Sequence, residues 1–217
     1  MIDILKQFKG VVDIPTEKEK LDSLNEQFCL IAKELLYGGY FLIEGKKRLY
    51  LDDIEFYYHE ETADGLKDPI MYHTNQNEGK GKEIPYFELG RLNLHISGID
   101  VTFENSDKHY RASFLIREYN VIYENKKERT VKNSTEIYDD MLFNGITQDN
   151  AAGIEWVDDN EDVQLKKPDW RRNVPDYEKD PENPEVWIKK KASGEGTFSV
   201  GKYSYAKCPL NWQFAKE

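Results

Sequence analysis

Cysteine is scarce in this chain, and Cys29 and Cys208 are the two that occur among 217 residues. They lie far apart and show none of the short spacings that metal-binding cysteines use. Cys29 falls within a helical pattern, and isolated thiols of this kind usually behave as small apolar residues. The pair therefore predicts neither a metal site nor a catalytic nucleophile.

Long apolar runs are absent as well. No segment combines the length and the apolar composition that a membrane-spanning helix needs. The residues from Met1 to Lys6 include an acid where a signal peptide would carry net positive charge. We therefore expect no membrane partner and a cytoplasmic location.

The middle of the chain contains nothing composed like a long interdomain linker. Apolar residues make up 39% of the sequence, which is enough to bury one sizeable core. The sequence therefore predicts a single domain over residues 1–217, with an N-terminal extension at 1–15 and long irregular loops at 62–87 and 166–184.

Basic residues are outnumbered, with 30 Lys and Arg against 41 Asp and Glu and a net charge of −11. A broad nucleic-acid footprint needs cations to neutralise phosphates, so this balance weighs against one. The charges are unevenly distributed along the chain, however, and basic residues gather near Lys80, Lys108, Arg171 and Lys189. A mixed solvated surface and a segregated basic face both remain open.

Local patterns predict one long helix near the N-terminus. Thr16 and Glu19 have the spacing of a capping box, which marks a helix start. Apolar residues then recur at helical spacing from Leu21 to Leu36 and form one face. Gly38 and the glycine after it predict a left-handed stop.

Alternating segments predict a strand-rich middle. The expected elements are a hairpin of residues 40–44 and 48–57, two short strands or one bulged strand at 91–96 and 99–103, a long strand at 111–123, a short capped helix at 134–143, and a final strand at 201–214.

Residues 53–59 place one carboxylate, that of Glu55, among aromatic rings at the end of a strand-like run. A carboxylate in such a place can activate water beside a stacked base. The alternative is that Glu55 points to solvent from an amphipathic strand.

Six short segments resemble family motifs and occur in the same order as those motifs. The segments are residues 31–36, 54–57, 68–73, 90–98, 114–117 and 172–174. Residues 54–57 read Ile-Glu-Phe-Tyr, His73 follows Asp68-Pro69, and 114–117 read Phe-Leu-Ile-Arg. In that order the segments resemble the motifs "LA..LLG", "TEAY", "D.ASHA", "G..YVY..YG", "VLIRA" and "R.G." of the alkyladenine (3-methyladenine, methylpurine) DNA glycosylase family. The resemblance covers roughly residues 27 to 210.

The resemblance implies an α+β fold, with a curved, largely antiparallel sheet flanked by helices, similar to the formyltransferase C-terminal-domain-like fold of those enzymes. It also implies a monofunctional N-glycosylase of DNA repair that needs no metal or other cofactor. Glu55 would deprotonate water at the anomeric carbon of a flipped nucleotide, and Arg117 and the Val174 carbonyl would hold that water.

The same resemblance implies a base pocket and a DNA-binding surface. Aromatic walls would stack the modified nucleobase, and basic residues would contact DNA. The expected pocket residues are Tyr57, His73 and His95, and the expected DNA-binding residues are Arg91, Ile99, Lys108, Arg111 and Arg172.

The chain departs from the family at the hairpin tip, where the family inserts a tyrosine into DNA. Residues 97–100 offer only Ile99 as a wedge, with Asp100 beside it. We therefore expect single-stranded or mismatched DNA as partner. Two other functions remain open: a non-catalytic module that binds a nucleobase, nucleoside or protein in an aromatic pocket, and a structural interaction protein in which Glu55, Arg117 and His73 do not converge.

Overall fold

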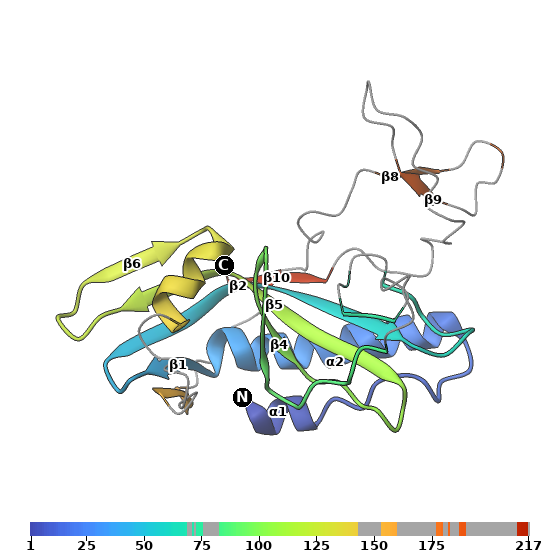
Figure 1. The fold of residues 1–217 in the computed structure, drawn as a ribbon, viewed down its shortest axis with the longest axis horizontal. Helices are drawn as coiled ribbons and strands as arrows, with labels where there is room; N and C mark the ends of the chain where they lie inside the picture. The colour runs from blue at the N-terminus through green and yellow to red at the C-terminus, as the bar shows by residue number, and fades with distance from the viewer. Residues whose placement is uncertain are drawn as a thin grey trace.

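The computed structural model describes residues 1–68, 71, 73–75, 83–142, 153–159, 177–179, 182, 187–189 and 212–216. It shows an α+β fold in which a curled antiparallel sheet forms a half-barrel with few helices (Figure 1). The helical elements are α1 (Ile2–Lys6), α2 (Glu17–Tyr37), the 3₁₀ turn η1 (Ser134–Glu136) and the π turn η2 (Tyr138–Leu142).

The main sheet has the strand order β3-β4-β5-β2-β1-β7, and β10 and β6 also pair with β2 and β5. Its strands are β1 (Gly39–Ile43), β2 (Lys47–Glu60), β3 (Leu92–His95), β4 (Gly98–Thr102), β5 (Tyr110–Ile122), β6 (Glu128–Val131), β7 (Ile154–Asp158) and β10 (Gln213–Ala215). A separate two-stranded sheet pairs β8 (Tyr177–Lys179) with β9 (Trp187–Lys189).

Helix α2 begins at the predicted capping box. The Thr16 hydroxyl oxygen accepts from the Glu19 amide at 3.3 Å and donates to the Glu19 carboxylate at 2.6 Å. The predicted apolar face is buried, and Phe28 stacks on Phe56 of β2 with ring centroids 4.5 Å apart. The predicted left-handed stop is wrong, because Gly38 has right-handed φ and ψ of −92° and −4°.

The hairpin of β1 and β2 is confirmed, and Glu44 and Gly45 both take positive φ, 52° and 66°, at its turn. Positive φ at two successive turn residues is the geometry that suits the right-handed twist of a hairpin. Strand β2 continues three residues beyond the predicted end, to Glu60. This extension places His59 on the same strand as Glu55.

Two adjacent bulges interrupt the ladder between β2 and β5. The pairs run from Leu51↔Tyr119 through Asp53↔Glu118 to Ile54↔Ile116. Asp52 is therefore the extra residue on β2, and Arg117 is the extra residue on β5. Strict alternation would send Ile116 and Tyr119 to opposite faces, and the bulge allows both to reach the core.

The two faces of the sheet differ in polarity. One face packs on α2 and carries Ile54, Phe56, Phe114 and Ile116 in the main core. Cross-strand partners share a face, so the register assigns the opposite face to another set. That polar face carries Asp53, Glu55, Tyr57, His59, Arg111, Ser113, Leu115, Arg117, Asp100 and Gln213.

Other elements differ from expectation. Helix α1 lies in the predicted N-terminal extension, and β6 and β7 were not predicted. The predicted helix at 134–143 is instead the two turns η1 and η2, with Phe143 outside the described residues. The described part of 62–87 contains no helix or strand, as expected, whereas β8 falls within the predicted loop at 166–184. Of the predicted final strand at 201–214, residues 213 and 214 lie in β10, Trp212 is not in a strand, and residues 201–211 lie outside the described residues. None of the helices described is long and apolar enough to cross a membrane.

Candidate functional site

Glu55, Tyr57 and Arg117 meet on the polar face and are called here the Glu55 cluster. Oε2 of Glu55 accepts a hydrogen bond from Arg117 Nη2 at 2.6 Å and another from the Tyr57 hydroxyl at 2.9 Å. Glu55 and Tyr57 are two residues apart on β2 and so share a face. Arg117 is the bulged residue of β5, and bulges of this kind re-aim side chains beside functional sites.

The Glu55 cluster is buried. Glu55 is 0% exposed and Arg117 is 4% exposed. Removing two charges from water is costly, and a close ion pair offsets that cost only when its geometry is good. Two donors on one carboxylate oxygen supply such geometry and fix the orientation of the carboxylate.

The predicted loop at 62–87 covers this cluster through Met71. Met71 is 1% exposed and packs with Tyr57 and Leu115 in a small apolar cluster. Beside it, Gln213 of β10 donates to Asp53 at 2.7 Å. Tyr57 is therefore packed with Met71 and Leu115, with its hydroxyl bound to Glu55, and is not an open stacking wall in this structure.

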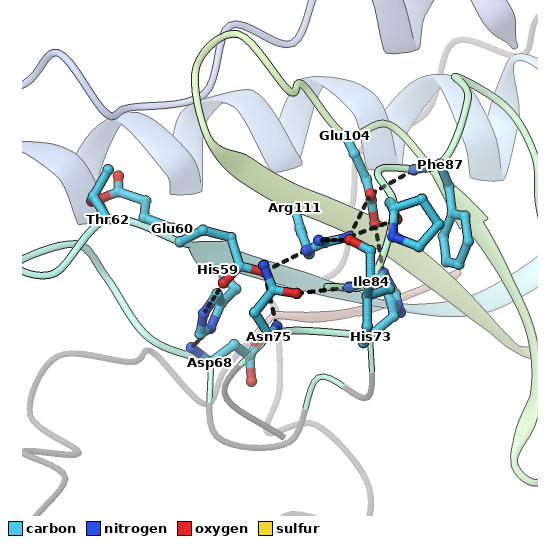
Figure 2. Close-up of polar contacts among 12 residues, drawn as sticks. His59, Glu60, Thr62, Asp68, His73, Asn75, Ile84, Phe87, Glu104 and Arg111 are labelled. Atoms are coloured by element: carbon cyan, nitrogen blue, oxygen red, sulfur yellow. Dashed lines mark hydrogen bonds and ion pairs between the residues drawn. The ribbon is translucent and has the colours of Figure 1, made fainter. Parts of the chain in front are cut away.

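A second group of buried charges lies at the other end of β2, centred on Arg111 (Figure 2). Its guanidinium contacts Glu61 at 2.5 Å and Glu104 at 3.2 Å. It also donates to the carbonyl oxygens of Ile84 and Pro85, at 2.6 and 3.1 Å. These contacts of Arg111 with Glu61, Glu104, Ile84 and Pro85 are called here the Arg111 network. The network joins the sheet to residues 84 and 85 of the loop.

More contacts fasten the same loop to the sheet. The Asp68 amide donates to His59 Nδ1 at 3.1 Å, and the Asn75 amide donates to Glu61 at 3.1 Å (Figure 2). His73 Nε2 lies 2.9 Å from Glu104 Oε1. His73 is thus within the Arg111 network, and its ring packs against Phe87 with centroids 5.4 Å apart.

Glu61 has a strongly altered acidity. Burial alone would raise its pKa, but His59, whose Nε2 lies 3.7 Å from the carboxylate, and hydrogen bonds from Arg111 and the Asn75 amide lower it from 4.5 to about 2. A carboxyl group whose pKa is lowered by folding stabilises the folded state above its unfolded pKa. That stabilisation is lost as the pH falls from about 4.5 towards 2.

We expect Glu61→Gln to remove this pH dependence. The unfolding free energy of wild type should exceed that of E61Q by its largest amount above pH 4.5, and this difference should shrink as the pH falls towards 2. Urea denaturation of both proteins at pH 6 and pH 3 measures it. An equal difference at both pH values would contradict a lowered pKa for Glu61. The control is Glu128→Gln, which changes an exposed carboxylate.

His95 also lies on the sheet, but its side chain makes its contacts within its own hairpin, β3–β4. Its Nε2 lies 3.2 Å from Asp100 Oδ1, and its Nδ1 accepts from the Ser97 amide at 3.2 Å. The Tyr138 hydroxyl donates to the Gly98 carbonyl at 2.8 Å and also contacts the His95 carbonyl. His95 therefore closes the β3–β4 hairpin, and the register places Asp100 in one row with Leu115 and Glu55.

Of the predicted DNA-binding residues that the structure describes, two are buried and two are at the surface. Arg111 and Ile99 are each 0% exposed, the first in its network and the second in the apolar core, so neither reaches a ligand in this structure. Arg91 is exposed and lies over the Phe87 ring, and Lys108 pairs with Asp13 at 3.0 Å. Arg172 and Val174 lie outside the described residues.

Sequence reasoning missed Glu61, Glu104 and His59. Glu55 and His59 share the alternation of β2, which was the available signal. Polar residues at alternate positions of a strand usually face water, however, and nothing in the pattern showed that a loop covers this face.

A hollow of about 720 Å³ lies elsewhere, lined by Lys47, Tyr123, Arg129 and Asp140 among others. Burial lowers the pKa of Lys47, whose Nζ donates to the Asp140 carbonyl oxygen at 2.5 Å. The Asp140 carboxylate in turn accepts from Tyr119 and Arg129, at 2.7 and 2.5 Å. These charges hold η2 against the sheet, so we assign this network to structure.

No family model, no curated protein and no solved structure matches this chain. Among the residues that the structure describes, no three His, Cys, Asp or Glu side chains are grouped so as to hold a metal ion. The case for a function therefore depends on the geometry of the Glu55 cluster.

Proposed function

We propose that this protein is a DNA N-glycosylase that hydrolyses the N-glycosidic bond of a flipped, modified base, with Glu55 as general base. The observation that carries the proposal is the convergence of Arg117 and Tyr57 on one oxygen of the buried Glu55 carboxylate. A fixed carboxylate buried away from water suits a step in which positive charge develops on a sugar.

The proposed step is a displacement by water at the anomeric carbon. Glu55 takes a proton from the water while the bond between sugar and base breaks, and its charge stabilises the oxocarbenium-like transition state. Arg117 contacts the carboxylate itself at 2.6 Å, so its role here is to orient Glu55.

Entry of a base requires movement of Met71, which packs on Tyr57. Expelling a base from a paired duplex costs a few kcal/mol more than from a single strand or mismatch. Ile99, the expected wedge, is buried in the core and cannot replace an expelled base in this structure. Single-stranded or mismatched DNA is therefore the proposed substrate.

The second candidate is a non-catalytic module that binds a nucleobase, nucleoside or protein. The closure of the site favours it, since Glu55 has no exposed surface and Tyr57 is buried together with Met71 and Leu115. A ligand that displaces Met71 could stack there without any reaction.

An assay of base release separates the two candidates. We expect abasic sites, detected by alkaline cleavage, in oligonucleotides carrying alkylated, deaminated or oxidised purines, and faster release from single-stranded or mismatched than from paired DNA. No release from any substrate, together with measurable binding of free nucleobases, would favour the binding module. Faster release from paired duplex would contradict the assignment of the strand preference.

A further inference from the structure

Three tyrosines gather where the end of α2 meets the sheet, and they are called here the tyrosine cluster. Tyr37 is the last residue of α2, Tyr40 lies in β1 and Tyr50 lies in β2. The ring centroids of Tyr40 and Tyr50 are 4.9 Å apart. Tyr37 and Tyr40 are buried, and Tyr50 is half-buried. The proposed reaction at Glu55 uses none of these three side chains.

The ammonium group of Lys216 lies on the tyrosine cluster. Its Nζ is 5.5 Å from the centroid of the Tyr37 ring and 5.7 Å from the centroid of the Tyr50 ring. A cation within about 6 Å of an aromatic centroid is attracted by the negative face of the ring. Lys216 follows β10, and its amide donates to the Asp52 carbonyl oxygen at 2.8 Å. The backbone at Lys216 is therefore fixed to β2, while its side chain reaches the rings.

Asp52 supplies a negative charge beside these rings. It is the extra residue of β2 at the bulge, and its Oδ1 lies 3.5 Å from Lys216 Nζ. Burial raises the pKa of the Asp52 carboxyl, so a cation beside it stabilises its charged form. A separation of 3.5 Å is longer than an ordinary hydrogen bond, and the contact therefore depends mainly on charge attraction. A cation with no hydrogen to donate would keep that attraction.

A second cation lies on the same cluster. The guanidinium carbon of Arg48 is 5.3 Å from the centroid of the Tyr40 ring. Two interpretations fit the position of Lys216: a tether that holds the end of β10, or the occupant of a binding site. The tether is not needed for the backbone, because β10 is already paired with β2 from Gln213 to Ala215. The contacts of the Lys216 side chain therefore favour a binding site.

We propose that Tyr37, Tyr50 and Asp52 form a binding site for the quaternary ammonium group of a trimethylated lysine, and that Lys216 fills this site as an internal competitor. The site already accepts a lysine side chain over its two rings, so a second lysine side chain has the matching shape. Trimethylation keeps the positive charge and removes the hydrogen-bond donors, which favours transfer of the cation from water onto aromatic rings. The Lys216 side chain leaves for solvent when the ligand binds, while its amide keeps the chain on β2. The inference is independent of the proposed glycosylase function.

The test is a titration with N-acetyl-trimethyllysine amide, followed by NMR at constant ionic strength. Lys216→Ala removes the internal competitor and should lower the dissociation constant of this probe by a factor on the order of ten. Two further changes are made in the Lys216→Ala protein. Tyr50→Leu removes a ring and should weaken binding about 5–30-fold, and Asp52→Asn removes the half-exposed charge and should weaken it about 2–5-fold.

Matched controls separate the site from general effects of charge and packing. Lys18→Ala removes an exposed lysine of α2 and should leave the dissociation constant at the wild-type value. Tyr50→Phe keeps the ring and should bind like its Lys216→Ala parent. Thermal melts confirm that each variant is folded, and Asp52→Asn, which leaves all three rings in place, decides the matter if Tyr50→Leu does not fold.

Two other probes define the ligand. Choline carries the same quaternary ammonium group without the lysine stem, and 3,3-dimethylbutan-1-ol is its neutral counterpart. Tighter binding of the trimethyllysine amide than of choline supports the proposal, whereas tighter binding of choline would overturn the assignment to lysine. Equal binding of choline and the neutral alcohol would exclude recognition of charge. No gain in affinity on Lys216→Ala would show that Lys216 is a tether and would overturn the proposal.

Discussion

Replacing Glu55 by glutamine is expected to slow base release by a factor on the order of 10²–10⁴. Glutamine keeps the length of the side chain and an oxygen that accepts from Tyr57 and Arg117, but it cannot take a proton from water. It also removes the negative charge opposite the developing oxocarbenium ion. Because the change is confined to charge and basicity, binding of the oligonucleotide should persist. Single-turnover kinetics and fluorescence anisotropy measure the two quantities separately.

The control for this experiment is Glu128→Gln, an exposed carboxylate on β6 that should leave the rate unchanged. Glu55→Gln leaves the Arg117 guanidinium buried opposite a neutral group, so a lower melting temperature is expected and the assay must be run well below it. Activity that survives this substitution would refute Glu55 as the base.

The elements with strong local signals were predictable from the sequence. The capping box at Thr16, the apolar face of α2 and the turn before β2 each depend on residues close together in the chain. The strand-rich middle likewise followed from alternation. Strands β6 and β7 were missed because their local signal is weak and their pairing with β5 and β1 is decided by the tertiary structure.

The convergence of Glu55 with Arg117 was predictable only in part. Glu55 and Tyr57 share a face by simple alternation, whereas Arg117 is 62 residues away and lies at a bulge. A bulge shifts alternation by one residue, and nothing in residues 114–117 shows its position. Resemblance to family motifs suggested that the residues meet, and the physical reason is the register of β2 and β5.

The Arg111 network shows a different limit of sequence reasoning. Arg111 and Lys108 are close in the sequence and were both expected to bind DNA, yet one is 0% exposed and the other is at the surface. Charge alone cannot predict which side chain is covered, because the covering carbonyl groups of Ile84 and Pro85 come from a loop distant in sequence. The buried carboxylates Glu61 and Glu104 then neutralise the guanidinium.

Removing Arg117 alone is expected to destabilise the protein by about 3–5 kcal/mol. In Arg117→Met the Glu55 carboxylate stays buried without its counter-ion, and the methionine cannot donate a hydrogen bond to it. In Glu55→Gln it is the Arg117 guanidinium that stays buried, opposite a neutral side chain. The double variant removes both charges, so its loss of unfolding free energy should fall short of the sum by about 0.5–3 kcal/mol. Urea denaturation of the four proteins gives this coupling energy.

An exposed ion pair with the same separation between its charged atoms provides the comparison. Lys18 and Asp22 on α2 are also 2.6 Å apart, but their side chains are 86% and 58% exposed. The corresponding cycle with Lys18→Met and Asp22→Asn should give a coupling too small to resolve, because water screens exposed charges. Additive losses at Glu55 and Arg117 would contradict the ion pair as described.

The double variant also separates folding from chemistry. Buried ion pairs can often be replaced by uncharged groups with little loss of stability, whereas loss of one partner is costly. If Glu55→Gln/Arg117→Met melts close to wild type and releases no base, the two charges serve the reaction. The alternative result is that wild type releases no base and the double variant binds free nucleobases as tightly as wild type. In that case the charges of Glu55 and Arg117 serve neither catalysis nor recognition. The aromatic and apolar side chains of Tyr57, Met71 and Leu115 must then provide the binding.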